Sequence, residues 1–250
     1  MARNCGKFTV KVKQGMKVPC FCFYKATSTN YLAKVFVREN RLERPVVFMA
    51  KSQTQGRGRY DRSFISPEGG LYMTYISPAN EGFSLWSTMS AVAVSRVLMK
   101  AGVHATIKWP NDLKIDGKKI CGILPESVVT DKRYVVMGIG VNINTTEDDL
   151  GEVKDIATSV YMTTGKKMSV KKFFKLLVTE LYSVFEIEDA DDLLFEYNRK
   201  CETLGQQIVD AEGFSGTATA ISNDGSLVVE RGEAQKEIVW GEICYVGNEK

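Results

Sequence analysis

The chain has 250 residues, of which 33 are basic and 30 acidic, so its net charge is +3 at pH 7. It is 44% hydrophobic and 25% charged, which is a globular composition with enough apolar residues to bury a core. The small net charge argues against bulk binding to nucleic acid or to a membrane, so any cationic site must be local.

The start of the chain and its cysteines predict an intracellular setting. The opening segment, MARNCGKFTVKVKQG, has no long apolar run, so we expect no secretory signal, no membrane span and a cytoplasmic protein. The six cysteines include no CxxC pair, and the one histidine is His104. We therefore expect reduced thiols, and neither a disulfide framework nor a zinc site.

The N-terminal third of the chain predicts short strands. Alternating or β-branched apolar residues indicate strands at 8–12, 21–26, 46–52 and 71–77. The polar run TSTN at 27–30 predicts a turn after the second of these strands. The segment 31–38 fits either a short helix or a strand.

A long amphipathic helix is predicted over 84–101, because its apolar residues recur at spacings of three and four. Ser84 is a suitable N-cap, and Gly102 stands where a helix commonly ends. Two later helices are predicted, one beginning near Ser169 and one over 191–201.

Further strands lie between these helices. HATIKW at 104–109 predicts a strand that stops at Pro110, and 113–124 predicts a hairpin that turns at an Asp-Gly pair. The apolar run at 134–144 predicts a buried strand that carries two glycines.

After Thr203 the chain contains short strands divided by turns, such as NDG at 223–225, and no helical pattern. This predicts a small β-barrel-like module over 204–250 that follows a larger domain over 1–203. A mixed sheet with helices followed by an all-β module is an α+β architecture.

Residues 56–62, GRGRYDR, place Arg57, Arg59 and Arg62 on one flexible loop. Glycine lets backbone N–H groups converge on an anion, and guanidinium groups bind phosphate or carboxylate. We therefore predict a cationic flap that closes over an anionic ligand and shields a reactive intermediate from water. The alternatives are a solvated basic loop or an RGG-type RNA-binding tract, although the motif occurs once and not in a series.

A second candidate site follows in KWPND at 108–112. Asp112 stands at a turn, where it can bind a metal or a nucleophilic amine, or simply cap the turn. Strand alternation directs Lys119 away from the side of Lys118 and into a pocket, where it can bind a carboxylate as its charge changes. Two solvated hairpin lysines are the alternative.

Gly138, Gly140 and Asn142 form a third candidate site. Glycines within a buried strand indicate a close approach to the backbone, by a ligand or by a packed helix. The Asn142 amide offers a donor and an acceptor, as a purine edge requires. Ser28 and Thr29 of TSTN offer hydroxyls that can hydrogen-bond a small polar ring.

In this order and separation, the motifs resemble those of biotin protein ligases of the type without a DNA-binding domain. The matching segments are TSTN (27–30), Gln53 with GRGR (56–59), SPEGGLY (66–72), KWPND (108–112), KKICGIL (118–124), GIGVNIN (138–144) and WGEI (240–243). The resemblance extends from about residue 24 to residue 247, which is nearly the whole chain.

The resemblance implies a core similar to class II aminoacyl-tRNA synthetases, with a mixed sheet and helices, and an SH3-like C-terminal domain. It also implies a reaction in two steps. Biotin and MgATP give biotinoyl-5′-AMP and pyrophosphate, and the biotinoyl group is then transferred to one lysine of a biotin carboxyl carrier domain. A lipoate or octanoate ligase with a related core is the alternative, which the GRGR and KWPND motifs disfavour.

The resemblance assigns roles residue by residue. The biotin site would comprise Ser28, Thr29, Asn30, Gln53, Gly56, Arg57, Gly70, Lys119, Gly122, Gly138 and Gly140. The ATP and adenylate site would comprise Arg57, Arg59, Arg62, Phe64, Asn111, Lys119 and Asn142. Lys119, Arg57 and Asp112 would be catalytic, with Asp112 acting on the acceptor lysine and helping to place Mg²⁺.

Two positions depart from the family pattern: Gln55 replaces a usual alanine, and Phe64 a usual tryptophan. The smaller ring predicts weaker retention of ATP or the adenylate. Roughly 20 residues precede the first core strand, so we expect no helix-turn-helix domain and no DNA partner. A homodimer formed through a sheet edge is expected by analogy with the family.

Overall fold

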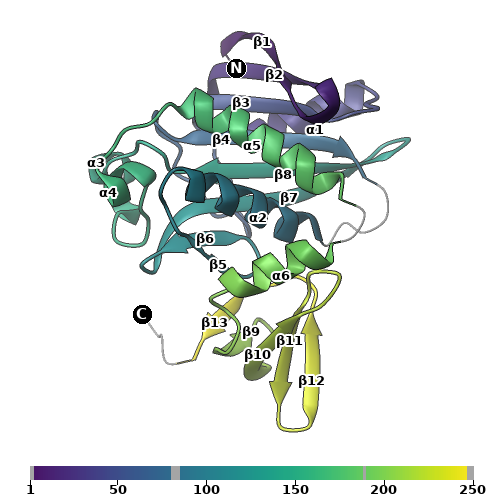
Figure 1. Ribbon diagram of the computed structural model, residues 1–250, viewed down its shortest axis with the longest axis vertical. Helices are drawn as coiled ribbons and strands as arrows, with labels where there is room; N and C mark the ends of the chain where they lie inside the picture. The colour runs from purple at the N-terminus through teal and green to yellow at the C-terminus, as the bar shows by residue number, and fades with distance from the viewer. Residues whose placement is uncertain (1–2, 80–84, 188–189, 247–250) are drawn as a thin grey trace.

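A mixed sheet of eight strands forms the larger part of the molecule, in a computed structural model that describes residues 3–79, 85–187 and 190–246 (Figure 1). In order across the sheet, the strands are β1 (Arg3–Lys11), β2 (Lys17–Ala26), β3 (Val46–Gln53), β4 (Leu71–Pro78), β8 (Arg133–Val141), β7 (Lys118–Val129), β6 (Asp112–Ile115) and β5 (Thr106–Lys108). Strands β2 and β3 pair in parallel, and the other neighbours pair antiparallel. The sheet is therefore mixed, as the sequence predicted.

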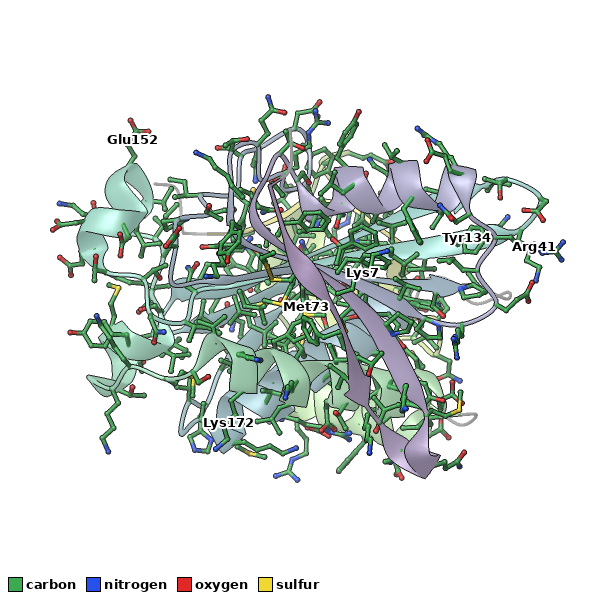
Figure 2. All side chains as sticks on the ribbon, turned by 90° about the horizontal axis from the view of Figure 1, so that it is seen from above. Lys7, Arg41, Met73, Tyr134, Glu152 and Lys172 are labelled. Atoms are coloured by element: carbon green, nitrogen blue, oxygen red, sulfur yellow. A yellow bond between two sulfur atoms is a disulfide. The ribbon has the colours of Figure 1, made fainter. Side chains whose placement is uncertain are left out.

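Helices cover both faces of this sheet. Seen from above, α1 (Thr29–Glu39) lies on one side and α5 (Val170–Phe185) on the other (Figure 2). Helix α2 (Leu85–Lys100) packs beside α5 over the same core, which includes Met73. The opposite core includes Tyr134 and the apolar side of α1. Apolar residues on both faces of the central strands explain their nearly continuous hydrophobic runs.

The segment 31–38, which fitted either a helix or a strand, belongs to α1. The helix begins at Thr29, inside the predicted turn, because Ser28 is its N-cap and accepts a hydrogen bond from the Tyr31 backbone N–H at 3.4 Å. Thr29 and Asn30 therefore lie in the first helical turn. The TSTN motif places these two side chains by starting a helix, and the prediction of a simple turn is wrong.

A second, antiparallel sheet lies below the first in Figure 1, with α6 (Asp191–Lys200) between them. Its order is β12 (Ala234–Ile238), β11 (Leu227–Arg231), β10 (Ser215–Ile221), β9 (Gln207–Asp210) and β13 (Ile243–Tyr245). Trp109 joins the two sheets: its backbone N–H donates to the Thr203 hydroxyl and its indole N–H to the Gly225 carbonyl, both at 3.0 Å. Trp109 thus fixes the KWPND segment against the smaller sheet.

The remaining predicted elements are mostly confirmed, with shifted ends. The β6–β7 hairpin turns at Asp116 and Gly117, both with positive φ, as an Asp-Gly turn requires. Gly102 has φ +80° at the end of α2, whereas Ser84 lies outside the described residues. Strand β8 ends at Val141, three residues before the end of the predicted strand at 144. Asn142 therefore lies just after the strand.

Short helices complete the described chain. They are η1 (Lys13–Gly15), α3 (Glu147–Leu150), η2 (Gly151–Val153) and α4 (Val160–Thr164). The last three form a small lobe beside the end of β8 (Figure 1). Within the described residues, no helix is both long and apolar enough to span a membrane.

The expectation that all six cysteines are reduced is wrong at one pair, because Cys5 and Cys22 form a disulfide between β1 and β2. A register shift between Asn4 and Gly6 brings Cys5 beside Cys22, with their Cα atoms 5.3 Å apart. This separation lies within the range that a disulfide spans. The pairing depends on a strand irregularity that the spacing of the cysteines did not indicate.

Candidate active site

A cavity of about 360 Å³ lies where the motifs of the sequence meet. Its volume lies in the range of small-molecule sites. Most of the predicted site residues line it: Ser28, Thr29, Asn30, Gln53, Arg57, Arg59, Arg62, Phe64, Asn111, Asp112, Lys119, Gly122, Gly138, Gly140 and Asn142. Gly56 and Gly70 are not among its lining residues, but they lie against Phe64 and Tyr72, which are.

The first turn of α1 and the end of β3 form a polar end of the cavity. The Gln53 side-chain oxygen accepts from the Thr29 backbone N–H at 2.8 Å and from the Thr29 hydroxyl at 3.2 Å. The Gln53 amide nitrogen donates to the Ser66 hydroxyl at 3.0 Å. These bonds fix which way the Gln53 amide points, so the polar end is held in one arrangement.

Gly56 closes the base of the flap. A Cβ atom there would lie 2.3 Å from the Phe64 carbonyl oxygen and 2.5 Å from the Ser66 hydroxyl. The two ends of the flap can therefore meet only because this residue has no side chain. The Phe64 N–H donates to the Gly56 carbonyl at 2.8 Å, which ties the ends together.

Lys119 and Asp112 form an ion pair in the cavity wall, with Nζ and Oδ1 separated by 2.6 Å. Lys119 also lies 5.8 Å from the centre of the Phe64 ring. The Lys119 backbone N–H donates a hydrogen bond to the Ile156 carbonyl, and the Lys119 carbonyl accepts one from the Thr158 N–H. The Lys118 ammonium instead donates to the Lys154 carbonyl at the surface. The predicted inward direction of Lys119 is confirmed.

The strand glycines make room for side chains of the protein. A Cβ atom on Gly140 would lie 2.6 Å from the Phe64 ring, and one on Gly122 would lie 2.9 Å from the Lys119 side chain. A Cβ atom on Gly138 would lie 2.4 Å from the Asn30 amide. The close approach predicted at the β8 glycines is therefore made by the flap and by the first turn of α1.

Three buried polar atoms of the wall have no hydrogen-bond partner among the described residues: Arg59 Nε, Asn142 Oδ1 and Asp112 Oδ1, of which the last is paired with the Lys119 ammonium. The Asn142 side-chain nitrogen donates to the Thr158 carbonyl at 3.0 Å, which leaves its oxygen as the unused acceptor. Buried polar groups are rarely left unpaired in folded proteins. A ligand that offers an N–H to Asn142 and an anionic oxygen to Arg59 would satisfy both.

The flap is held by the second sheet as well as by the first. The Arg59 guanidinium donates to Asn111 Oδ1 at 3.1 Å and to the Gly241 carbonyl, and its central carbon lies 4.5 Å from the centre of the Trp240 ring. Arg62 forms an ion pair with Glu242. Two flap cations therefore contact the WGEI segment, for which the sequence had predicted no role.

Tyr72 is a wall residue that sequence reasoning missed. Its hydroxyl donates to the Pro67 carbonyl at 2.8 Å, and burial raises the pKa of this phenol, so the ring stays neutral. Gly70 makes this possible, since a Cβ atom there would lie 2.1 Å from the Tyr72 hydroxyl. The sequence contains the GGLY segment, but the packing of Tyr72 on Gly70 depends on the folded loop.

Comparison with known proteins identifies the family. The model of the biotin/lipoate A/B protein ligase family matches residues 20–144, which contain all but one of the motifs above. The chain belongs to this family. The protein named bifunctional ligase/repressor BirA from Bacillus spizizenii is 31% identical over 237 residues, covering 87% of this chain and 71% of the relative. The biotin–[acetyl-CoA-carboxylase] ligase of Paracoccus denitrificans is 28% identical, covering 76% of this chain and 86% of the relative.

Solved structures agree with these relatives. The biotin protein ligase from Aquifex aeolicus in complex with biotin and ATP superposes with a TM-score of 0.79 at 28% identity. The superposition covers 90% of this chain and 97% of that one. The resemblance to biotin protein ligases predicted from the sequence is confirmed.

In this family member, the packing of Phe64 on Gly140 predicts how the flap is anchored. Gly140→Ala should displace the Phe64 ring, because its methyl group would lie 2.6 Å from the ring in the present arrangement. We expect faster tryptic cleavage at Arg57, Arg59 and Arg62, measured by mass spectrometry of timed digests. Val129→Ala is the control, since Val129 lies at the end of β7, is 67% exposed and makes no contact with the flap that the structure records. Equal cleavage of the two variants would contradict the anchoring role of Phe64.

Proposed function

We propose that the protein is a biotin protein ligase that joins biotin to a lysine of a biotin carboxyl carrier domain at the expense of ATP. The observation that carries the proposal is the Lys119–Asp112 ion pair, set between a polar pocket and a flap of three arginines. Lys119, which can bind a carboxylate, lies between the polar pocket and the flap. This arrangement suits a substrate with a small polar ring at one end and a carboxylate at the other. The names of the relatives favour biotin over lipoate within the shared family.

In the first half-reaction, the biotin carboxylate attacks the α-phosphorus of MgATP. The bond to the bridging oxygen breaks, and pyrophosphate leaves. The Lys119 ammonium binds the carboxylate and then the oxygens of the mixed anhydride, so the same cation stabilises the charge as it moves. Arg57, Arg59 and Arg62 bind the phosphates, because forked guanidinium groups match their oxygens.

The adenine lies at the Asn142 end of the cavity in this proposal. The unpaired Asn142 Oδ1 accepts a hydrogen bond from the exocyclic amine of the base. Phe64, which packs over Gly140 between this position and Lys119, covers the joined intermediate and excludes water. Asn111 positions Arg59 through its side-chain oxygen.

In the second half-reaction, the amine of the acceptor lysine attacks the acyl carbon, the bond to the phosphate oxygen breaks, and AMP leaves. Asp112 takes the proton from the acceptor ammonium, which creates the free amine that attacks. This carboxylate is available because Lys119 has turned toward the anhydride. Lys119 therefore serves the first step and Asp112 the second.

Magnesium enters as part of the MgATP substrate. The described residues contain no cluster of three or more acidic, histidine or cysteine side chains that could hold a metal ion. Mg²⁺ in nucleotide sites is commonly bound by the phosphates and one or two carboxylates. Asp112 and Glu242 are the carboxylates among the described lining residues, and Asp112 is the one we assign to such a role.

The finer architecture and the partners belong to the same proposal. The larger part, residues 1–203, corresponds to a class II synthetase-like catalytic domain, and residues 204–250 to an SH3-like domain. Trp109 and the flap contacts of Trp240–Glu242 support a working unit that includes both. We also propose a cytoplasmic homodimer that acts on the carrier domain of a biotin-dependent carboxylase.

Lys119→Ala should abolish most of the first step while the fold survives, because Lys119 lies in the cavity wall and not in the core. We expect biotin-dependent exchange of pyrophosphate into ATP to fall by about 100-fold or more, the usual effect of removing a group that stabilises developing charge. Lys118→Ala, on the neighbouring surface residue, should leave the exchange unchanged. Full activity of the Lys119 variant would remove this lysine from the mechanism.

Asp112→Asn should separate the two steps. We expect transfer of biotin from bound adenylate to the carrier domain to slow by about 100-fold or more, because the asparagine cannot take the proton. Adenylate formation should be much less affected. A single-turnover experiment measures both, with Asp116→Asn in the exposed β6–β7 turn as the matched control. Equal loss of both steps would contradict the assignment of Asp112 to the second.

A further inference from the structure

One carboxylate of β7 holds two residues of α1. The Asn30 side-chain nitrogen donates to Glu126 Oε2 at 2.8 Å, and the Lys34 ammonium lies 2.6 Å from Glu126 Oε1. Asn30 and Lys34 are four residues apart, so they stand one above the other on the same side of the helix. Glu126 thus binds the first turn and the second turn of α1 at once.

The Asn30 amide is fully engaged by the sheet. Its oxygen accepts from the Thr74 hydroxyl of β4 at 2.6 Å, and its nitrogen also donates to the Leu124 carbonyl of β7 at 3.3 Å. Gly138 of β8 provides the space that this amide fills. Two strands therefore hydrogen-bond this side chain and a third leaves room for it, and only 6% of Asn30 is exposed.

These contacts change the role expected of Asn30. Both N–H groups and the oxygen of its side chain are used within the protein, so little hydrogen-bonding capacity remains for a ligand. The residue instead pins the start of α1 to the sheet. The neighbouring residues, Ser28 and Thr29, present their side chains at the polar end of the cavity.

Hydrogen bonds of fixed direction are needed to position the first turn of α1. Ala33 and Val37 bury the apolar side of α1 against the sheet, but apolar burial is non-directional and permits small sliding and rotation of a helix. Hydrogen bonds with fixed geometry define the axial position of the first turn. A shift of that turn would move Thr29 away from Gln53, whose side-chain oxygen it meets at 2.8 Å.

We propose that Glu126, oriented by Lys34, is a positioning residue for biotin recognition. It fixes Asn30 and thereby sets Ser28 and Thr29 at the end of the cavity that receives the polar ring of the substrate. The inference rests on the proposed function, because it takes that end as the biotin-ring site. Glu126 and Lys34 have side chains 30% and 25% exposed, so their ion pair contributes little to global stability.

The test compares the affinity for biotin with that for ATP. Glu126→Ala should raise the Kd for biotin, measured by calorimetry, by about 10- to 100-fold, because displacements of about 1 Å near a site have effects of this size. The KM for ATP in pyrophosphate exchange and the melting temperature should change little. Glu126→Gln, which keeps an acceptor for Asn30, should restore part of the affinity.

Two further variants test whether Lys34 acts on Asn30 through Glu126. Lys34→Met should weaken biotin binding less than Glu126→Ala, because Asn30 keeps its acceptor. The double variant should be no weaker than Glu126→Ala alone, since both residues act through one path. Glu43→Ala is the matched control, because it breaks a surface ion pair with Lys132 of similar length, 2.7 Å. It should leave biotin binding unchanged.

The outcomes separate this inference from the proposed function. Thr29→Val tests the pocket itself and should weaken biotin binding. If it does, but Glu126→Ala leaves the Kd for biotin unchanged, the positioning role is wrong and the site assignment stands. If Thr29→Val has no effect, the biotin ring lies elsewhere and both fail. Equal loss of biotin and ATP affinity with a lowered melting temperature would make Glu126 a structural residue and overturn the inference.

Discussion

The ion pair between Lys119 and Asp112 is the interaction on which the site depends. The two charges lie on neighbouring strands, β6 and β7, and meet at 2.6 Å in the wall of a cavity rather than at an open surface. A partly buried charge needs a partner close by, so each of these residues holds the other in the site until a substrate replaces it. Gly122 leaves room for the lysine, and the 153–160 segment bonds its backbone, so the surrounding structure serves to orient one ammonium group.

Around this pair, the fold combines a packed sheet with the flap over 56–62, which is held at both its base and its tip. The sheet is packed on both faces by apolar helices, and the neighbouring glycines of β8 leave room for Phe64 and Asn30 on one of these faces. The flap is tied at its base by the Phe64–Gly56 hydrogen bond and at its tip by Trp240, Gly241 and Glu242. Since the tip contacts involve the same arginines that would bind phosphate, flap closure and the smaller sheet are physically linked. Trp109 links them again from the other side, through Gly225.

Features of the fold and the site could be predicted where a single residue type or the alternation of residues along a strand determines them. Alternation along a strand gave the inward direction of Lys119, and the β8 glycines indicated a close approach. What approached them could not be predicted, because Asn30 and Phe64 reach those glycines from segments far away in the chain. Glu126 and Glu242 were missed for the same reason: a surface-like glutamate becomes part of a site only through tertiary contacts. The Cys5–Cys22 disulfide depends on a register shift in β1 that no local pattern marks. The ligand-binding roles of Arg57, Arg59 and Asn142 remain predictions.

The most direct test of the account is an acceptor assay. The purified protein would be mixed with biotin, MgATP and a separately purified carrier domain, and the intact mass of the carrier would be measured, with lipoate in place of biotin as the control. The account predicts a mass gain equal to one biotinoyl group on a single lysine, which requires ATP and does not occur with lipoate. Transfer of lipoate, or the absence of both the mass gain and enzyme-bound biotinoyl-5′-AMP, would contradict it.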